Sequence, residues 1–339
     1  MESFIFAPQA SQFTLSTVLQ TLSSVILLVY LSLALGCSAI ALSVDLLGRI
    51  NVCKGKEDLA AKCIQIATGN FGVGFLFGVV PSISIWFAYT QFLFKQHTPV
   101  NNYFLWATFF NLVGLLFLNK YRDAFAVKKF VHGDGEAHEV LDHAETSMSY
   151  TGILGVSSLL TGGFFLIGGF AVAVDPGLWE HGFIVIFTSI QVWLKYTAFL
   201  CGALGVAGVA MIFYFLSWNG GIKHITDEIR EAAILCGSTL AIGFIPLYVI
   251  FTGLHLKFIP RADFSVSVIV YSCLAIFVLF VTLHMVYYAL VHKNKTAGLM
   301  TFVLVALSFL FVVMADNATR ENALRKQTYE LIKHSPKHH

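Results

Sequence analysis

The sequence predicts an all-α integral membrane protein, a helical bundle of about eight transmembrane helices with no substantial water-soluble domain. Hydrophobic residues make up 57% of the 339 residues, charged residues make up 12%, and the mean hydropathy is +0.76. A soluble globular chain carries roughly a quarter charged residues. Too few charges therefore remain to solvate the surface of a soluble domain. The net charge of +2 is also too small to indicate a nucleic-acid partner.

Long apolar runs recur along the whole chain, and each of them must be helical. Crossing the hydrocarbon core takes roughly 20 apolar residues in a helix, and backbone polar groups cannot stay unpaired in lipid. The start of the chain lacks a positive region and a small-residue cleavage site, so we expect the first run to be a retained helix. The expected spans are about 18–44, 67–94, 102–119, 150–174, 191–217, 229–254, 265–291 and 297–315.

The apolar stretch 183–217 is too long for one simple span. We divide it into a short interfacial piece near Phe183–Ile190 and a helix that starts at Gln191. The spans then form two four-helix bundles and leave a polar end. The expected organisation is a first bundle at 1–176, a second bundle at 177–316 and a polar C-terminal tail at 317–339.

The distribution of Lys and Arg predicts the orientation of these helices. The connections that are cytoplasmic when the N-terminus lies outside hold more Lys and Arg residues than the remaining connections and the tail together. Cytoplasmic loops of membrane proteins carry this excess. The sequence therefore predicts a bacterial-type inner membrane protein with both termini on the outer, periplasmic side.

Ionisable residues inside apolar spans are costly in lipid and mark candidate functional sites. His284 lies inside the seventh span, His255 ends the sixth span, and His97 ends the second. A neutral imidazole is a common axial haem ligand, so these three residues are candidate haem b ligands. His255 and His284 are expected near opposite membrane faces and are not expected to share one haem. The alternative for each is a structural histidine that bonds a neighbouring helix, water or a lipid headgroup.

Other polar residues at the span ends are Lys195, which opens the fifth span, Asp45, which ends the first, and Asp316, which ends the eighth. The loop residues His132, His138 and His143 are spaced so that they do not share a helix face, which does not favour a metal site. The chain also has no Walker loop, no H-E-x-x-H motif and no C-x-x-C pair. We therefore expect no metal site and no catalytic residue.

Three spans contain glycine-rich runs, at 69–78, 161–169 and 201–208. Small residues let helices approach closely in lipid. The same residues could instead leave room for a flat macrocycle, and both interpretations stay open at this point.

Five runs carry a family resemblance because of their order along the chain. They are GNFGVGFLFGVVPSISIWFAY (69–89), NKYRDA (119–124), LGVSSLLTGGFFLIGGFAVAVDP (154–176), QVWLKYTAFLCGALGVAGVAM (191–211) and FVVMADNATRENAL (311–324). In this order they resemble helix two, the exit of helix three, helix four, helix five and the closing motif of subunit I of cytochrome bd-type quinol oxidases. Arg320 falls at the Arg position of that closing motif, with Asp316 as an acidic neighbour.

The haem ligands of that family are missing from this chain. The first-helix His falls near Leu27 and Leu28, the fifth-helix His falls near Ala198, and the seventh-helix Met falls near Val268–Val270. The third-helix carboxylates are also absent, and the quinol loop is reduced to about 255–264. The resemblance therefore implies a divergent member, with a bd-like scaffold that has lost oxygen reduction.

The resemblance implies a membrane subunit of a respiratory electron-transfer complex, rather than an enzyme alone, with other membrane subunits and cytochromes as partners. It implies haem b held by relocated ligands, a quinone, or neither. A quinone site is expected near the outer ends of the sixth and eighth spans, at His255, Arg261 and Arg320. The alternatives are a cofactor-free structural or assembly subunit and a small-molecule transporter. The transporter is the less favoured alternative, because no inverted repeat is detected and acidic residues within the spans are scarce.

Overall fold

The computed structural model describes residues 10–50, 56–94, 96–131, 138–218, 226–259 and 265–333. Within these ranges the chain contains helices and no strands, which confirms the all-α prediction. Eight helices are long and apolar enough to cross a membrane. These spans are Thr14–Gly48, Phe71–Phe92, Val100–Phe125, Met148–Ala173, Ile190–Ser217, Asp227–Phe258, Val266–His292 and Lys295–Arg325.

Several spans contain short non-α turns, and shorter helices lie between the spans. The order is α1 (Ala10–Ile50), α2 (Lys56–Thr68), α3 (Phe71–Gly74), the π-helical turn η2 (Phe75–Val79), α4 (Val80–Phe92), α5 (Val100–Val131), α6 (His138–Ala173), the 3-10 segment η3 (Pro176–Ile184), α7 (Val185–Thr188), α8 (Ile190–Ile212), the π-helical turn η4 (Phe213–Ser217), α9 (Asp227–Phe258), α10 (Val266–His292) and α11 (Lys295–Lys333).

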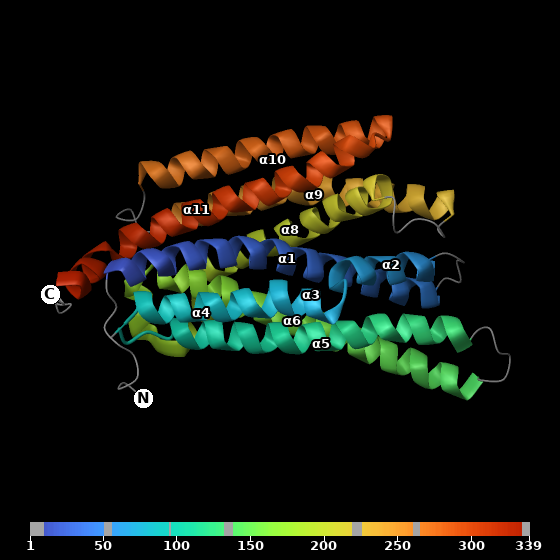
Figure 1. Ribbon diagram of the computed structural model, residues 1–339, viewed down its shortest axis with the longest axis horizontal. Helices are drawn as coiled ribbons and strands as arrows, with labels where there is room; N and C mark the ends of the chain where they lie inside the picture. The colour runs from blue at the N-terminus through green and yellow to red at the C-terminus, as the bar shows by residue number, and fades with distance from the viewer. Residues whose placement is uncertain are drawn as a thin grey trace.

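All the long helices lie roughly along one axis, with α1 in the middle of the bundle (Figure 1). Helix α1 contacts α4 and α6 on one side and α8 and α11 on the other. The closest neighbours elsewhere are the pairs α5 and α6, α8 and α9, and α10 and α11. Helix α1 begins and α11 ends at the same end of the bundle. We call this the terminal end, and the sequence predicts that it faces outside.

Helix α2 occupies residues that were expected to form the connection between the first and second spans, apart from its last two residues. Gly69 follows α2 with a positive φ of 54°, a backbone conformation that glycine adopts readily. Asn70 then caps the next helix, because its side chain accepts a hydrogen bond of 2.8 Å from the Val73 amide. The second span therefore begins at Phe71 and not at the expected residue 67.

The long apolar stretch 183–217 is broken at Ser189, which has extended backbone angles between α7 and α8. The break lies within two residues of the expected start of the fifth span at Gln191. Helix α11 extends well past residue 316, where the sequence analysis started a polar tail, and it continues to Lys333. Leu324 is still buried in the bundle.

The glycine-rich run 201–208 serves close helix packing. A Cβ added to Gly36 on α1 would lie 2.7 Å from the Cβ of Ala207 on α8, and one added to Gly208 on α8 would lie 2.7 Å from the Ala241 amide of α9. Real Cβ atoms essentially never approach so closely. The run 201–208 therefore brings α8 against α1 and α9, and neighbouring helices fill the space that a macrocycle would need.

Candidate functional site

A cavity of about 90 Å³ lies among α8, α9, α10 and α11, with Leu28 of α1 and Ile167 of α6 on its inner wall. Most of its wall is apolar, with Ala198, Phe199 and Leu279 among the lining residues. Ligand sites commonly combine such walls with a few polar groups that fix orientation. The polar lining residues are Lys195, Tyr248, Thr252, His255, Ser272 and Asp316.

Helical periodicity explains why these residues face one space. On α9, Tyr248, Thr252 and His255 are spaced four and three residues apart, which puts them on one face of the helix. On α10, the lining positions from Ser272 to Leu279 follow the same spacing. Each helix therefore contributes one stripe of side chains to the cavity wall.

An ion pair forms part of the cavity wall. Nζ of Lys195 on α8 lies 2.9 Å from Oδ1 of Asp316 on α11, and the two side chains are 13% and 31% exposed. Within a membrane an isolated charge is costly, and an opposite charge at this distance offsets the cost. The pair also joins α8 to α11 across the cavity.

His255 is the one imidazole that lines the cavity in the described part of the chain, and it is only 5% exposed. Its Nδ1 atom has no hydrogen-bond partner among the described residues. A buried polar atom without a partner costs free energy, and Nδ1 of His255 is such an atom. Nearby, the Gln191 side-chain amide donates to the Phe258 carbonyl and ties the start of α8 to the end of α9.

A second, smaller cavity lies on the other side of the ion pair. Its volume is about 10 Å³, and its polar wall consists of Gln20, Ser24, Tyr89, Lys195 and Asp316. A polar cavity needs roughly 10–15 Å³ to hold one water molecule. The second cavity therefore has about the size and polarity that one water requires.

Arg320 lies beyond this second cavity and is 2% exposed. One of its Nη atoms donates to Oε1 of Gln20 on α1, and Nε2 of Gln20 donates to Ser24 at 2.9 Å. The guanidinium lies 4.1 Å from the ring centroid of Phe92 and 5.7 Å from that of Tyr89. These contacts stabilise a buried cation without a carboxylate partner among the described residues.

The structure separates the residues that the sequence suggested for cofactor binding. His284 is exposed on α10, where its Nδ1 lies 2.9 Å from the Phe280 carbonyl of its own helix, and His97 is exposed between α4 and α5. Arg320 packs among α1, α4 and α11 and does not line the larger cavity. Arg261 lies outside the described residues, as do the side chains of His132, His138 and His143.

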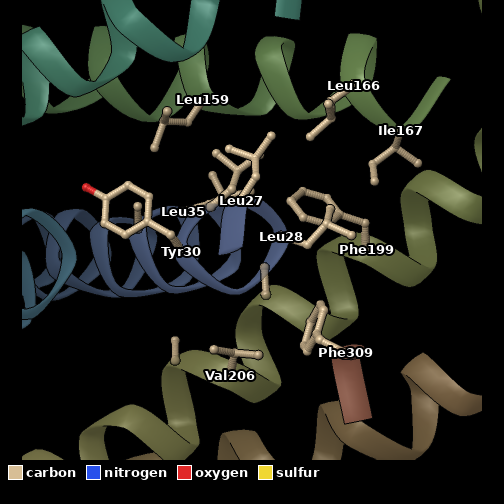
Figure 2. Close-up of a cluster of buried hydrophobic side chains, with 14 of the residues drawn as sticks. Leu27, Leu28, Tyr30, Leu35, Leu159, Leu166, Ile167, Phe199, Val206 and Phe309 are labelled. Carbon is tan, nitrogen blue, oxygen red and sulfur yellow. The ribbon is translucent and has the colours of Figure 1, made fainter. Parts of the chain in front are cut away.

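The residues present do not fit haem b held by two axial ligands. Figure 2 shows Leu27 and Leu28, two positions where the resemblance would place a haem ligand, within a cluster of packed apolar side chains that includes Phe199. Ala198, another such position, is also buried. Among the residues that the structure describes, the larger cavity is lined by one imidazole and by no Met or Cys side chain. We therefore assign no function through haem.

The sequence analysis missed several polar residues of this region, above all Gln20, Tyr248 and Thr252. Gln20 and Ser24 are spaced four residues apart in the first span, and Thr252 precedes His255 by three. Polar residues at helical spacing within an apolar span were the signal that could have found them.

The fold and its large exposed apolar surface define the chain as a multi-span α-helical membrane protein. Comparisons with family models, with curated proteins and with solved structures found no match. The resemblance to cytochrome bd-type quinol oxidases therefore stays a prediction that rests on the quoted motifs.

Proposed function

We propose that the chain is a quinone-binding membrane subunit of an electron-transfer complex and that the larger cavity holds the quinone ring. The observation that carries this proposal is the buried His255, with its unpaired Nδ1, in an apolar cavity that also contains the Lys195–Asp316 pair. The expected partners are the membrane and cytochrome subunits that the family resemblance implies.

The polar groups of the cavity suit both redox forms of a quinone. A quinone carbonyl accepts hydrogen bonds, and the Lys195 ammonium and an imidazole N–H are donors. A quinol hydroxyl donates, and an unprotonated imidazole nitrogen or the Asp316 carboxylate accepts. The apolar wall, with Phe199 and Leu279, suits the faces of the ring. The role assigned to these residues is to bind and orient the ring.

The size of the cavity favours a ring that is only partly enclosed. An engineered apolar cavity of roughly 150 Å³ binds benzene, whereas the present cavity measures about 90 Å³. A substituted quinone ring would therefore extend out of the cavity, and its chain would lie outside the helix bundle.

The test compares two histidine variants of the purified chain. Binding of a benzoquinone with a decyl chain is measured by quenching of the intrinsic tryptophan fluorescence. We expect His255→Leu to weaken binding about tenfold, equivalent to about 1.4 kcal/mol, because it removes a buried hydrogen-bonding group. His284→Leu is the matched control, since His284 is on the exposed surface of α10 and should leave binding unchanged.

The proposal would be contradicted if the His255→Leu variant bound the quinone as tightly as the wild-type chain. It would also be contradicted if His255→Leu and His284→Leu weakened quinone binding equally. A cofactor-free anchor is the second candidate, and the packed apolar side chain at Leu27 favours it. This candidate predicts that the wild-type chain binds no quinone but is still required for assembly of its partner subunits, which deletion of the chain and native gel analysis would reveal.

A further inference from the structure

We infer that the larger cavity opens sideways to the lipid between α9 and α10, and that Gly253 keeps this opening free. The inference rests on the proposed function where it concerns the quinone, which would then enter and leave through the side of the protein. The opening itself is a property of the described residues and can be tested without a quinone.

Two residues locate the opening. Gly253 of α9 and Ile276 of α10 both line the cavity, and both are exposed at the surface of the protein. A residue that belongs to the cavity wall and to the outer surface at once lies at the rim of an opening. The buried lining residues Ala275 and Leu279 lie farther inside on α10.

Gly253 has more free space around it than the glycines at the contact between α8 and α9. A Cβ on Gly205 or Gly237 would meet atoms of the adjacent helix within 3.0 Å, whereas a Cβ on Gly253 would meet no atom within 4 Å. The space in front of Gly253 is therefore free of protein among the described residues. A larger side chain at this position would fill the opening without forcing α9 and α10 apart.

The surface around the opening is apolar. Ile250, about one turn from Gly253 on α9, and Phe280, about one turn from Ile276 on α10, are exposed, as expected for a surface that faces lipid. A ligand that passes here must be soluble in the hydrocarbon core. The geometry therefore points to a lipid-soluble compound whose ring enters the cavity and whose apolar chain stays against α9 and α10.

Gly253 lies five residues before the end of α9 at Phe258, which corresponds to about 7.5 Å along the helix. The opening is therefore close to the terminal end and within the leaflet on that side. Thr252 and His255 lie within two residues of Gly253 along α9 and also line the cavity.

The experiment uses Gly253→Phe in the full chain, reconstituted in lipid vesicles, with Gly243→Phe as the matched control. Gly243 is also an exposed glycine of α9 with no atom within 4 Å of an added Cβ, but it does not line the cavity. A lipid-soluble phenyl diazirine is activated by light, and the labelled residues are identified by mass spectrometry. Thermal unfolding of both variants verifies that they fold.

We expect the wild-type chain and Gly243→Phe to be labelled at cavity residues such as Thr252 and Ser272. Gly253→Phe should lose most of this labelling, by roughly tenfold, while the lipid-facing Phe277 stays labelled. Cavity labelling that is unchanged in Gly253→Phe would overturn the inference, because the compound would then reach the cavity by another route.

A second measurement separates the inference from the proposed function. In the same vesicles, the decyl benzoquinone should bind and dissociate about tenfold more slowly in Gly253→Phe, with a smaller change in its equilibrium constant. If the diazirine is blocked but the wild-type chain binds no quinone, the sideways opening stands and the proposed function fails. If the diazirine is blocked but quinone binds at the wild-type rate in Gly253→Phe, the opening is not the route of the quinone, and this part of the inference fails while the proposed function stands.

Discussion

The Lys195–Asp316 pair lines both cavities, and each charge offsets the cost of burying the other. The pair is mostly buried, and its residues are 121 positions apart in the chain. Removing one partner leaves the other charge in a low-dielectric environment without compensation. Replacing both partners with apolar residues removes the pair and the cost of burying it together.

We predict that Lys195→Met and Asp316→Leu each destabilise the protein by about 2–5 kcal/mol, and that the double variant recovers much of this loss. Unfolding midpoints of the detergent-solubilised variants, analysed as a double-mutant cycle, measure the coupling. If the double variant loses as much unfolding free energy as the two single variants together, the pair contributes no coupling energy.

Individual residues of the site could be predicted from the sequence, but not which of them contact each other. Lys195, His255 and Asp316 were conspicuous because ionisable groups in apolar spans are costly. Their meeting depends on the contact of α8 with α9 and α11, which no local pattern encodes. Arg320 shows the same limit, because it was expected in a quinone site and instead packs on the Phe92 ring.

Glycines on α8 decide how closely the long helices pack. Gly208 faces Gly237 and Ala241 of α9, and the backbones of the two helices touch at this crossing. In lipid, helix association depends on such close packing, because lipid chains are as apolar as the helices themselves.

We predict that Gly208→Val destabilises the protein by about 1–3 kcal/mol or more, because its Cβ would overlap α9. Gly243→Val on α9 projects into open space and should change stability by less than about 0.5 kcal/mol. Thermal unfolding and size-exclusion profiles in detergent distinguish these outcomes. Equal stability of the two variants would show that the α8 and α9 crossing can loosen without cost.

Apolar length predicted all eight spans, but it could not locate the boundaries within longer apolar regions. Most of α2 was expected in the connection between the first two spans, and only Ala67 and Thr68 were included in the second span, because they continue directly into the glycine-rich run. The positive φ at Gly69 and the Asn70 cap, which divide the two helices, are local turn features that hydropathy does not register.

Packing alone does not define which face of the whole bundle is outside, because an inverted bundle has the same contacts. The orientation remains the prediction from Lys and Arg, which places the terminal end outside in a bacterial-type inner membrane. His97 lies at the terminal end, and Asn294 lies at the opposite end between α10 and α11.

We predict that a membrane-impermeant maleimide labels His97→Cys in intact cells and labels Asn294→Cys only after the cells are opened. Both variants carry Cys273→Ser, because Cys273 is an exposed native thiol. Labelling read by gel shift measures accessibility at each end. The reversed pattern would invert the orientation of every helix.

Helix α11 is one unbroken helix of 39 residues, about 58 Å long, whereas the hydrocarbon core is roughly 30 Å thick. It touches the cavity at Phe309 and Asp316 and continues to Lys333. Leu324, eight residues beyond Asp316, is still buried in the bundle, so the part of α11 from there to Lys333 is about 13 Å long. A tilt of about 10° in α11 would move this end by about 2 Å relative to Leu324. Occupation of a cavity inside the membrane could in this way be transmitted as displacement to a neighbour beyond the bilayer, without any change in the fold.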